Sequence, residues 1–171
     1  QNQYGGFVYA GATMAFTTAY WVLGHYNPRE IAFLGCDMSY PKSSKTHFYG
    51  TGTADPLRED ITLISLEAKA ARLYALALAQ GCEITNLSQE NSRLIAPRRS
   101  LLEPRPEPFE IDKVQKAHAL AREQELAYYV ASGRYWEELE RFDIEQIKRL
   151  DALWSNVVIE PKEAAALMRG Y

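Results

Sequence analysis

The stretch IAFLGCDMSYPKSSKTHFYGTGTADPLR, residues 31–58, decides how this chain is interpreted. It opens with a short apolar strand, residues 31–34, which leads directly into Gly35 and Asp37. A polar loop follows and carries His47. In open α/β sheets, ligands bind just beyond the carboxyl ends of the strands. The stretch therefore predicts an α/β protein with a ligand site where this strand ends.

Strand and helix candidates alternate on both sides of that stretch. Residues 7–10 form an apolar strand candidate, and the Ala-rich residues 14–23 predict a buried helix. Residues 60–80 repeat leucine and alanine at helical spacing, with Asp60 as a candidate cap, and residues 82–85 predict a further strand. The order strand–helix–strand predicts parallel units with right-handed crossovers, as in a Rossmann-like sheet.

The composition changes after this region. Prolines and arginines predict an extended linker over residues 102–110, between an α/β region of residues 1–101 and a helical extension of residues 111–171. Two apolar-striped segments predict a helical hairpin in the extension: residues 111–131 and 135–157. The hairpin could bind a partner or pair two copies of the chain.

Composition limits the function classes. The 171 residues can form a sizeable core, and a net charge of −3 with both signs mixed argues against nucleic acid as a partner. The sequence has no run of about 18 apolar residues, so no membrane span is expected. Cys36 and Cys82 suit buried thiols of a reducing, cytoplasmic compartment, with a disulfide as the alternative. Because residue 1 is not methionine and no signal peptide is recognisable, the chain could begin inside a longer protein.

Two residues of the polar loop could carry chemistry. A histidine beyond a strand can act as a general base near neutral pH, which makes His47 the catalytic candidate; a surface histidine is the alternative. The carboxylate of Asp37 could orient His47, bind a ribose hydroxyl, or cap its own loop.

Three further groups could bind a nucleotide. Gly11, Ala12 and Thr13 open a helix, where backbone N–H groups attract anions. Gly35, which follows the strand just before Asp37, is a further candidate. Amides and hydroxyls after the last strand could recognise a base or sugar, or could simply cap a turn: Asn86, Ser88 and Ser92. Two cysteines without a histidine pair do not predict a zinc site.

The pattern from Gly5 to Leu101 resembles two related families. A glycine-led helix is followed by a strand ending in Gly35-Cys36-Asp37, and then by Thr46-His47-Phe48. This arrangement is similar to that of the bacterial CMP-sialic-acid sialyltransferases and of the archaeal 6-hydroxymethylpterin diphosphokinase-like proteins. The chain would correspond to the C-terminal part of their Rossmann-like fold, because the first strand and loop of those families have no counterpart before residue 1.

The sialyltransferase resemblance implies a transferase that uses a CMP-type sugar donor and a hydroxyl acceptor. His47 would be the general base, and Tyr40 or Tyr49 would stabilise the leaving phosphate together with amides near residues 11–13. No metal or cofactor would be required. The diphosphokinase resemblance implies ATP and Mg²⁺ instead, with Asp37 near the metal. A third alternative is a non-catalytic interaction module that retains the fold.

Overall fold

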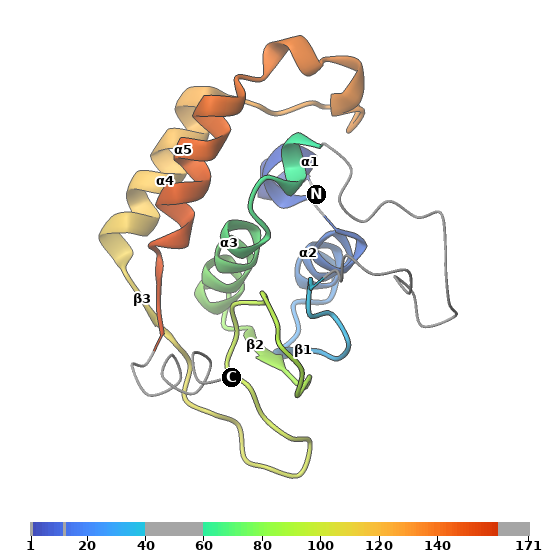
Figure 1. The fold of residues 1–171 in the computed structure, drawn as a ribbon, viewed down its shortest axis with the longest axis vertical. Coiled ribbons are helices and arrows are strands. Elements are labelled where there is room, and N and C mark those ends of the chain that lie inside the picture. Colours follow the sequence, from blue (N-terminus) through green and yellow to red (C-terminus); the bar gives the residue numbers. More distant parts are fainter. Residues whose placement is uncertain (1, 12, 40–59, 161–171) are drawn as a thin grey trace.

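The computed structural model describes residues 2–11, 13–39 and 60–160. Its central element is α3 (Leu66–Ala79), which lies between α2 (Met14–Tyr26) and the adjacent helices α4 (Lys113–Leu126) and α5 (Ile144–Ser155). Figure 1 shows this order across the molecule, with the strands β1 and β2 at one end of α3. Apolar side chains of α3 contribute to a core on the α2 side and to a second core on the hairpin side.

The sheet beside α3 is parallel. β1 (Glu30–Phe33) pairs with β2 (Glu83–Asn86) in a register that places Phe33 opposite Asn86. Because α3 connects the two strands, they form the parallel strand–helix–strand unit that the sequence predicts. In the described residues the parallel sheet has only these two strands, plus one bridge from Asn86 to Arg98. The α/β class is therefore confirmed at this level, whereas the larger Rossmann-like sheet stays a prediction.

The strand predicted at residues 7–10 is wrong. Phe7–Ala10 is a single helical turn, α1, in which the Ala10 N–H donates to the Gly6 carbonyl at 2.9 Å. It follows the short 3₁₀ turn η1 (Asn2–Tyr4). Periodicity cannot separate a short buried helix from a buried strand when every residue is apolar. The predicted strand–helix–strand unit that would begin at residue 7 is consequently absent.

Helix boundaries follow the capping side chains. The Ser65 hydroxyl accepts from the Ala68 N–H at 3.1 Å and begins α3, whereas the predicted cap Asp60 begins the preceding 3₁₀ turn η2 (Ile61–Leu63) instead. Asp112 and Asp143 cap α4 and α5 in the same way. An N-cap bond of this type contributes about 1 kcal/mol, which is enough to fix where a helix starts.

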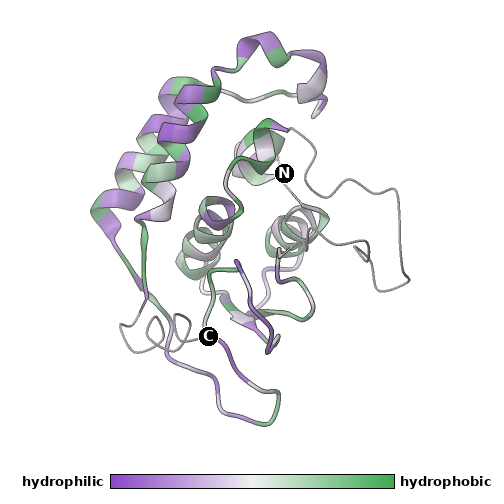
Figure 2. Cartoon of the chain, viewed as in Figure 1, coloured by the Kyte–Doolittle hydropathy of each residue, from purple (hydrophilic) through white to green (hydrophobic). Residues whose placement is uncertain are grey.

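The predicted hairpin is present, but its second helix begins at Ile144 rather than at residue 135. Residues 135–141 form two 3₁₀ turns, η3 (Tyr135–Glu137) and η4 (Leu139–Arg141), before α5 begins. A short antiparallel pair closes the base of the hairpin, β3 (Glu110–Ile111) with β4 (Val158–Ile159). Figure 2 shows hydrophilic bands along both α4 and α5, as expected for amphipathic helices with one face in water. No helix in the described ranges is both long and apolar enough to span a membrane.

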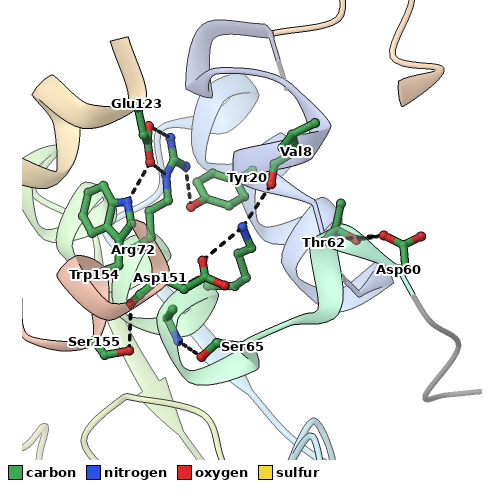
Figure 3. Close-up of polar contacts among 12 residues, drawn as sticks. Val8, Tyr20, Asp60, Thr62, Ser65, Arg72, Glu123, Asp151, Trp154 and Ser155 are labelled. Carbon is green, nitrogen blue, oxygen red and sulfur yellow. Dashed lines mark hydrogen bonds and ion pairs between the residues drawn. The ribbon is translucent and has the colours of Figure 1, made fainter. Parts of the chain in front are cut away.

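A buried ion pair joins the hairpin to α3 (Figure 3). Arg72 is only 2% exposed, and its guanidinium donates to both carboxylate oxygens of Glu123 on α4, at 2.6 and 2.8 Å. The same carboxylate accepts from the indole N–H of Trp154 on α5 at 2.7 Å. The guanidinium also donates to the Tyr20 hydroxyl at 2.9 Å and to the Tyr4 carbonyl at 2.8 Å. One arginine thus links the N-terminal segment, α2, α3 and the hairpin.

A second buried pair lies one turn away on α3. The Lys69 ammonium donates to the Val8 carbonyl at 3.0 Å and lies 3.6 Å from the Asp151 carboxylate. Burial raises the pKa of Asp151 above its ordinary value, and the Lys69 charge opposes that shift. Residues of the predicted extension therefore share a core with residues of the α/β region, and contacts with α3 hold the hairpin in place.

Candidate functional site

The candidate site lies at the carboxyl edge of the parallel sheet. Because Phe33 and Asn86 are paired at the ends of β1 and β2, the chain leaves both strands at the same edge. The Leu87 N–H donates to the Phe33 carbonyl at 2.7 Å and extends the pairing by one step. The loops that follow, residues 34–39 and 87–92, therefore start side by side, as the sequence predicts from strand order.

A direct contact joins the two loops. The Ser88 hydroxyl donates to Oδ2 of Asp37 at 2.8 Å and accepts from the Gly35 N–H at 3.3 Å. Ser88 is itself held in place, because its backbone N–H donates to Oδ1 of Asn86 at 2.9 Å. Four of the predicted site residues thus form one connected group, which the spacing along the chain indicated only indirectly.

Two polar atoms of this group are buried without a hydrogen-bond partner among the described residues. They are Oδ1 of Asp37 and Nδ2 of Asn86. Asn86 as a whole is only 1% exposed. One is an acceptor and the other is a donor. A buried polar atom left unpaired costs about 1–3 kcal/mol, so each is a position where an external partner would be stabilising.

The backbone around Asp37 is unusual. Gly35 has φ of 68° and Met38 has φ of 56°, so residues in the left-handed region lie on both sides of the carboxylate. This conformation costs a non-glycine residue about 1–2 kcal/mol. Met38 adopts it with its side chain buried in the core. The Arg93 N–H also donates to the Asp37 carbonyl at 2.8 Å. The carboxylate is therefore held in a strained but firmly supported loop.

The thiols do not add a nucleophile to this edge. Burial, with a smaller contribution from Asp37, raises the pKa of Cys36 above its ordinary value. Burial likewise raises the pKa of Cys82 to about 11. Both thiols are free and stay protonated near neutral pH, and the disulfide considered from the sequence is not formed.

Other predicted residues have local structural partners. The Thr13 hydroxyl accepts from the Phe16 N–H at 3.3 Å and caps α2. Gly11 ends α1, where a Cβ would meet the Phe7 carbonyl oxygen at 2.3 Å, so only glycine fits. The Ser92 hydroxyl accepts from the Leu94 N–H at 3.2 Å. Ala12, Tyr40, His47 and Tyr49 lie outside the described residues. Within the described ranges no three potential ligands gather in a way that could hold a metal ion.

Sequence reasoning missed the charges of α3. Lys69 and Arg72 are both buried, and each faces an acid of the hairpin, Asp151 and Glu123 respectively. The available signal was the matching pair of acids, Glu123 and Asp151, on the two predicted hairpin helices. Periodicity within one helix does not show that another helix covers its polar face.

Comparisons of the chain with protein-family models, with curated proteins and with solved structures found no match. The sialyltransferase and diphosphokinase resemblances therefore rest on the residues quoted above.

Proposed function

We propose that the carboxyl edge of β1 and β2 binds the sugar of a nucleotide, and that the protein transfers a sugar from a CMP-type donor to a hydroxyl acceptor. The observation that carries the binding part is the pair of unpartnered atoms, Oδ1 of Asp37 and Nδ2 of Asn86. The transfer part rests on the resemblance of residues 5–101 and on His47.

A hydroxyl-bearing ligand suits this edge for chemical reasons. A hydroxyl donates one hydrogen bond and accepts others, so sugar hydroxyls match a carboxylate acceptor and an amide donor. Because Ser88 donates to Oδ2 of Asp37, Oδ1 is the carboxylate oxygen that lacks a partner among the described residues. A phosphate beside Asp37 would meet a like charge, which is unfavourable. We therefore assign the ribose of the nucleotide, rather than its phosphate, to Asp37.

The proposed reaction is the one that the sialyltransferase resemblance implies. His47 takes the proton of the acceptor hydroxyl while the hydroxyl oxygen forms a bond to the donor-sugar carbon that carries the phosphate. The bond from that carbon to the phosphate oxygen breaks, and CMP leaves with the electron pair, its charge stabilised by Tyr40 or Tyr49. A well-placed general base contributes about 10²–10⁴-fold to the rate.

Nucleotide binding tests the proposal directly. CMP, CDP, AMP and ATP would be titrated by calorimetry with and without Mg²⁺, against wild type, Asp37→Asn and Ser88→Ala. Loss of one hydrogen bond to a charged group, about 1.5–3 kcal/mol, predicts roughly 10–150-fold weaker CMP binding for Asp37→Asn. Glu90→Gln is the matched control, because Glu90 is an exposed acid of the same loop region and should leave affinity unchanged.

The outcomes separate the alternatives. CMP binding without metal that is lost in Asp37→Asn supports the proposal, and a sugar-transfer assay with His47→Ala then tests the base. ATP binding that requires Mg²⁺ favours the diphosphokinase-like alternative. If no nucleotide binds, the transferase proposal fails and the interaction module becomes the better explanation.

A further inference from the structure

A hollow of about 550 Å³ lies between the N-terminal segment, α3 and α4. This volume is within the range of about 300–1,000 Å³ that is usual for small-molecule sites. Aromatic rings and amides form much of its wall: Tyr4, Tyr9, Tyr129, Gln80 and Gln124. Gln80 lies at the end of α3 that leads into the amino end of β2, whereas Asp37 and Ser88 follow the carboxyl ends of the strands. The hollow is therefore separate from the candidate nucleotide edge.

A second hollow, of about 190 Å³, adjoins the first at Gln3 and Tyr4 and continues along the last turns of α2. Trp21 lines it, is 51% exposed, and stacks on His25 with ring centroids 5.1 Å apart and planes only 9° apart. Gly24 lets the Gln3 side chain, which lines both hollows, pack closely against α2, because a Cβ there would lie 2.3 Å from Nε2 of Gln3. The two hollows together form one extended surface with aromatic rings at both ends.

The surface carries little free charge. Arg72 and Glu123 line the larger hollow, but they are bound to each other at 2.6 Å and are almost fully buried. A charged ligand would lose hydration without gaining an opposite charge, which is costly. Apart from His25, Trp21 and aliphatic side chains, the rest of the lining consists of amides, phenols and backbone, which are uncharged polar groups. The ligand that fits this electrostatic environment is neutral.

We propose that these adjoining hollows bind a neutral oligosaccharide. Sugar rings have apolar faces that pack on aromatic side chains, and their hydroxyls both donate to and accept from amides and phenols. Trp21 at one end and Tyr129 at the other would each cover a sugar ring, with Gln3, Gln80 and Gln124 bonding hydroxyls between them. Two hollows that share a boundary favour at least two linked sugar units.

The test uses the full chain and defined sugars. Maltotetraose, cellotetraose and tetraacetylchitotetraose would be titrated by calorimetry and by tryptophan fluorescence. Loss of one aromatic contact predicts about 2–12-fold weaker binding for Trp21→Ala and for Tyr129→Ala. Trp136→Ala is the matched control, since Trp136 is 58% exposed and lines neither hollow. Circular dichroism would show that each variant is folded.

The proposal does not depend on the nucleotide site, so Asp37→Asn should bind these sugars as the wild type does. Absence of binding by all three sugars at about 10 mM, where even a complex with a Kd of about 1 mM is mostly formed, would overturn it. Binding that survives both Trp21→Ala and Tyr129→Ala would also overturn it, because the sugars would then lie elsewhere. A preference for planar aromatic compounds over every sugar would refute the ligand class.

Discussion

Replacing Glu123 by alanine should destabilise the protein more than any surface substitution. The Glu123 carboxylate accepts two hydrogen bonds from Arg72 and one from Trp154, all between 2.6 and 2.8 Å. After truncation, the buried guanidinium keeps two acceptors among the described residues, the Tyr20 hydroxyl and the Tyr4 carbonyl, and loses its counter-charge. An uncompensated buried charge, rather than lost packing, is the main cost.

Breaking a buried ion pair by removing one partner costs about 3–5 kcal/mol. That is a large share of the roughly 5–15 kcal/mol by which domains are stable. In a chain of 171 residues, about 1 kcal/mol shifts Tm by roughly 2–4 °C, so Tm should fall by roughly 6–20 °C. Urea and thermal unfolding followed by circular dichroism would measure both quantities.

Two further variants make this prediction specific. Glu145→Ala removes an exposed partner of Lys148 on α5 and should cost less than about 1 kcal/mol. Arg72→Met combined with Glu123→Leu removes both charges and should be more stable than Glu123→Ala alone. If Glu123→Ala cost no more than Glu145→Ala, the buried pair would not hold the hairpin to α3 and the reasoning would be refuted.

Two other substitutions test local features. Gly133→Ala should lower the unfolding free energy more than Gly81→Ala. Both glycines have φ near +75°, which costs alanine about 1–2 kcal/mol, but only at Gly133 would a Cβ also meet the Phe7 ring, at 2.9 Å. Equal losses of unfolding free energy would contradict this. Asp151→Asn tests linkage to pH. Since burial raises the pKa of Asp151, the folded state binds a proton there at a higher pH than the unfolded state does. The stability of the wild type relative to Asp151→Asn should therefore increase as the pH is lowered from about 7 to about 3.5. Urea titrations that show a relative loss over this range would show that the sign is wrong.

The elements that sequence reasoning located correctly had local signals. The helix at residues 66–79 repeats apolar residues at helical spacing, and β1 lies in the short apolar run that precedes Gly35. Strand order predicts that Asp37 and Ser88 lie at one edge of the sheet, because parallel strands end at a common edge. The hydrogen bond between them is known only from the structure.

The errors arose where distant contacts decide the structure. Phe7–Ala10 is apolar throughout, so its sequence suits a buried strand and a buried turn of helix equally. Arg72 and Glu123 are 51 residues apart in sequence, and a charge on an amphipathic helix is normally solvated. Only the tertiary structure shows that the hairpin covers this charge, which explains why the network in Figure 3 was not anticipated.

The hairpin and the candidate site both depend on α3, yet they should respond differently to mutation. Glu67 at the start of α3 binds Arg93 at 2.5 and 2.8 Å, but both side chains are about two-fifths exposed, so the pair contributes little. Asp37 is instead positioned by the pairing of β1 with β2 and by Ser88, and neither interaction involves Glu123. Glu123→Ala should therefore lower the unfolding free energy while the molecules that remain folded bind nucleotide with wild-type affinity. A parallel loss of affinity at a temperature where the variant is fully folded would mean that the hairpin contacts also shape the site.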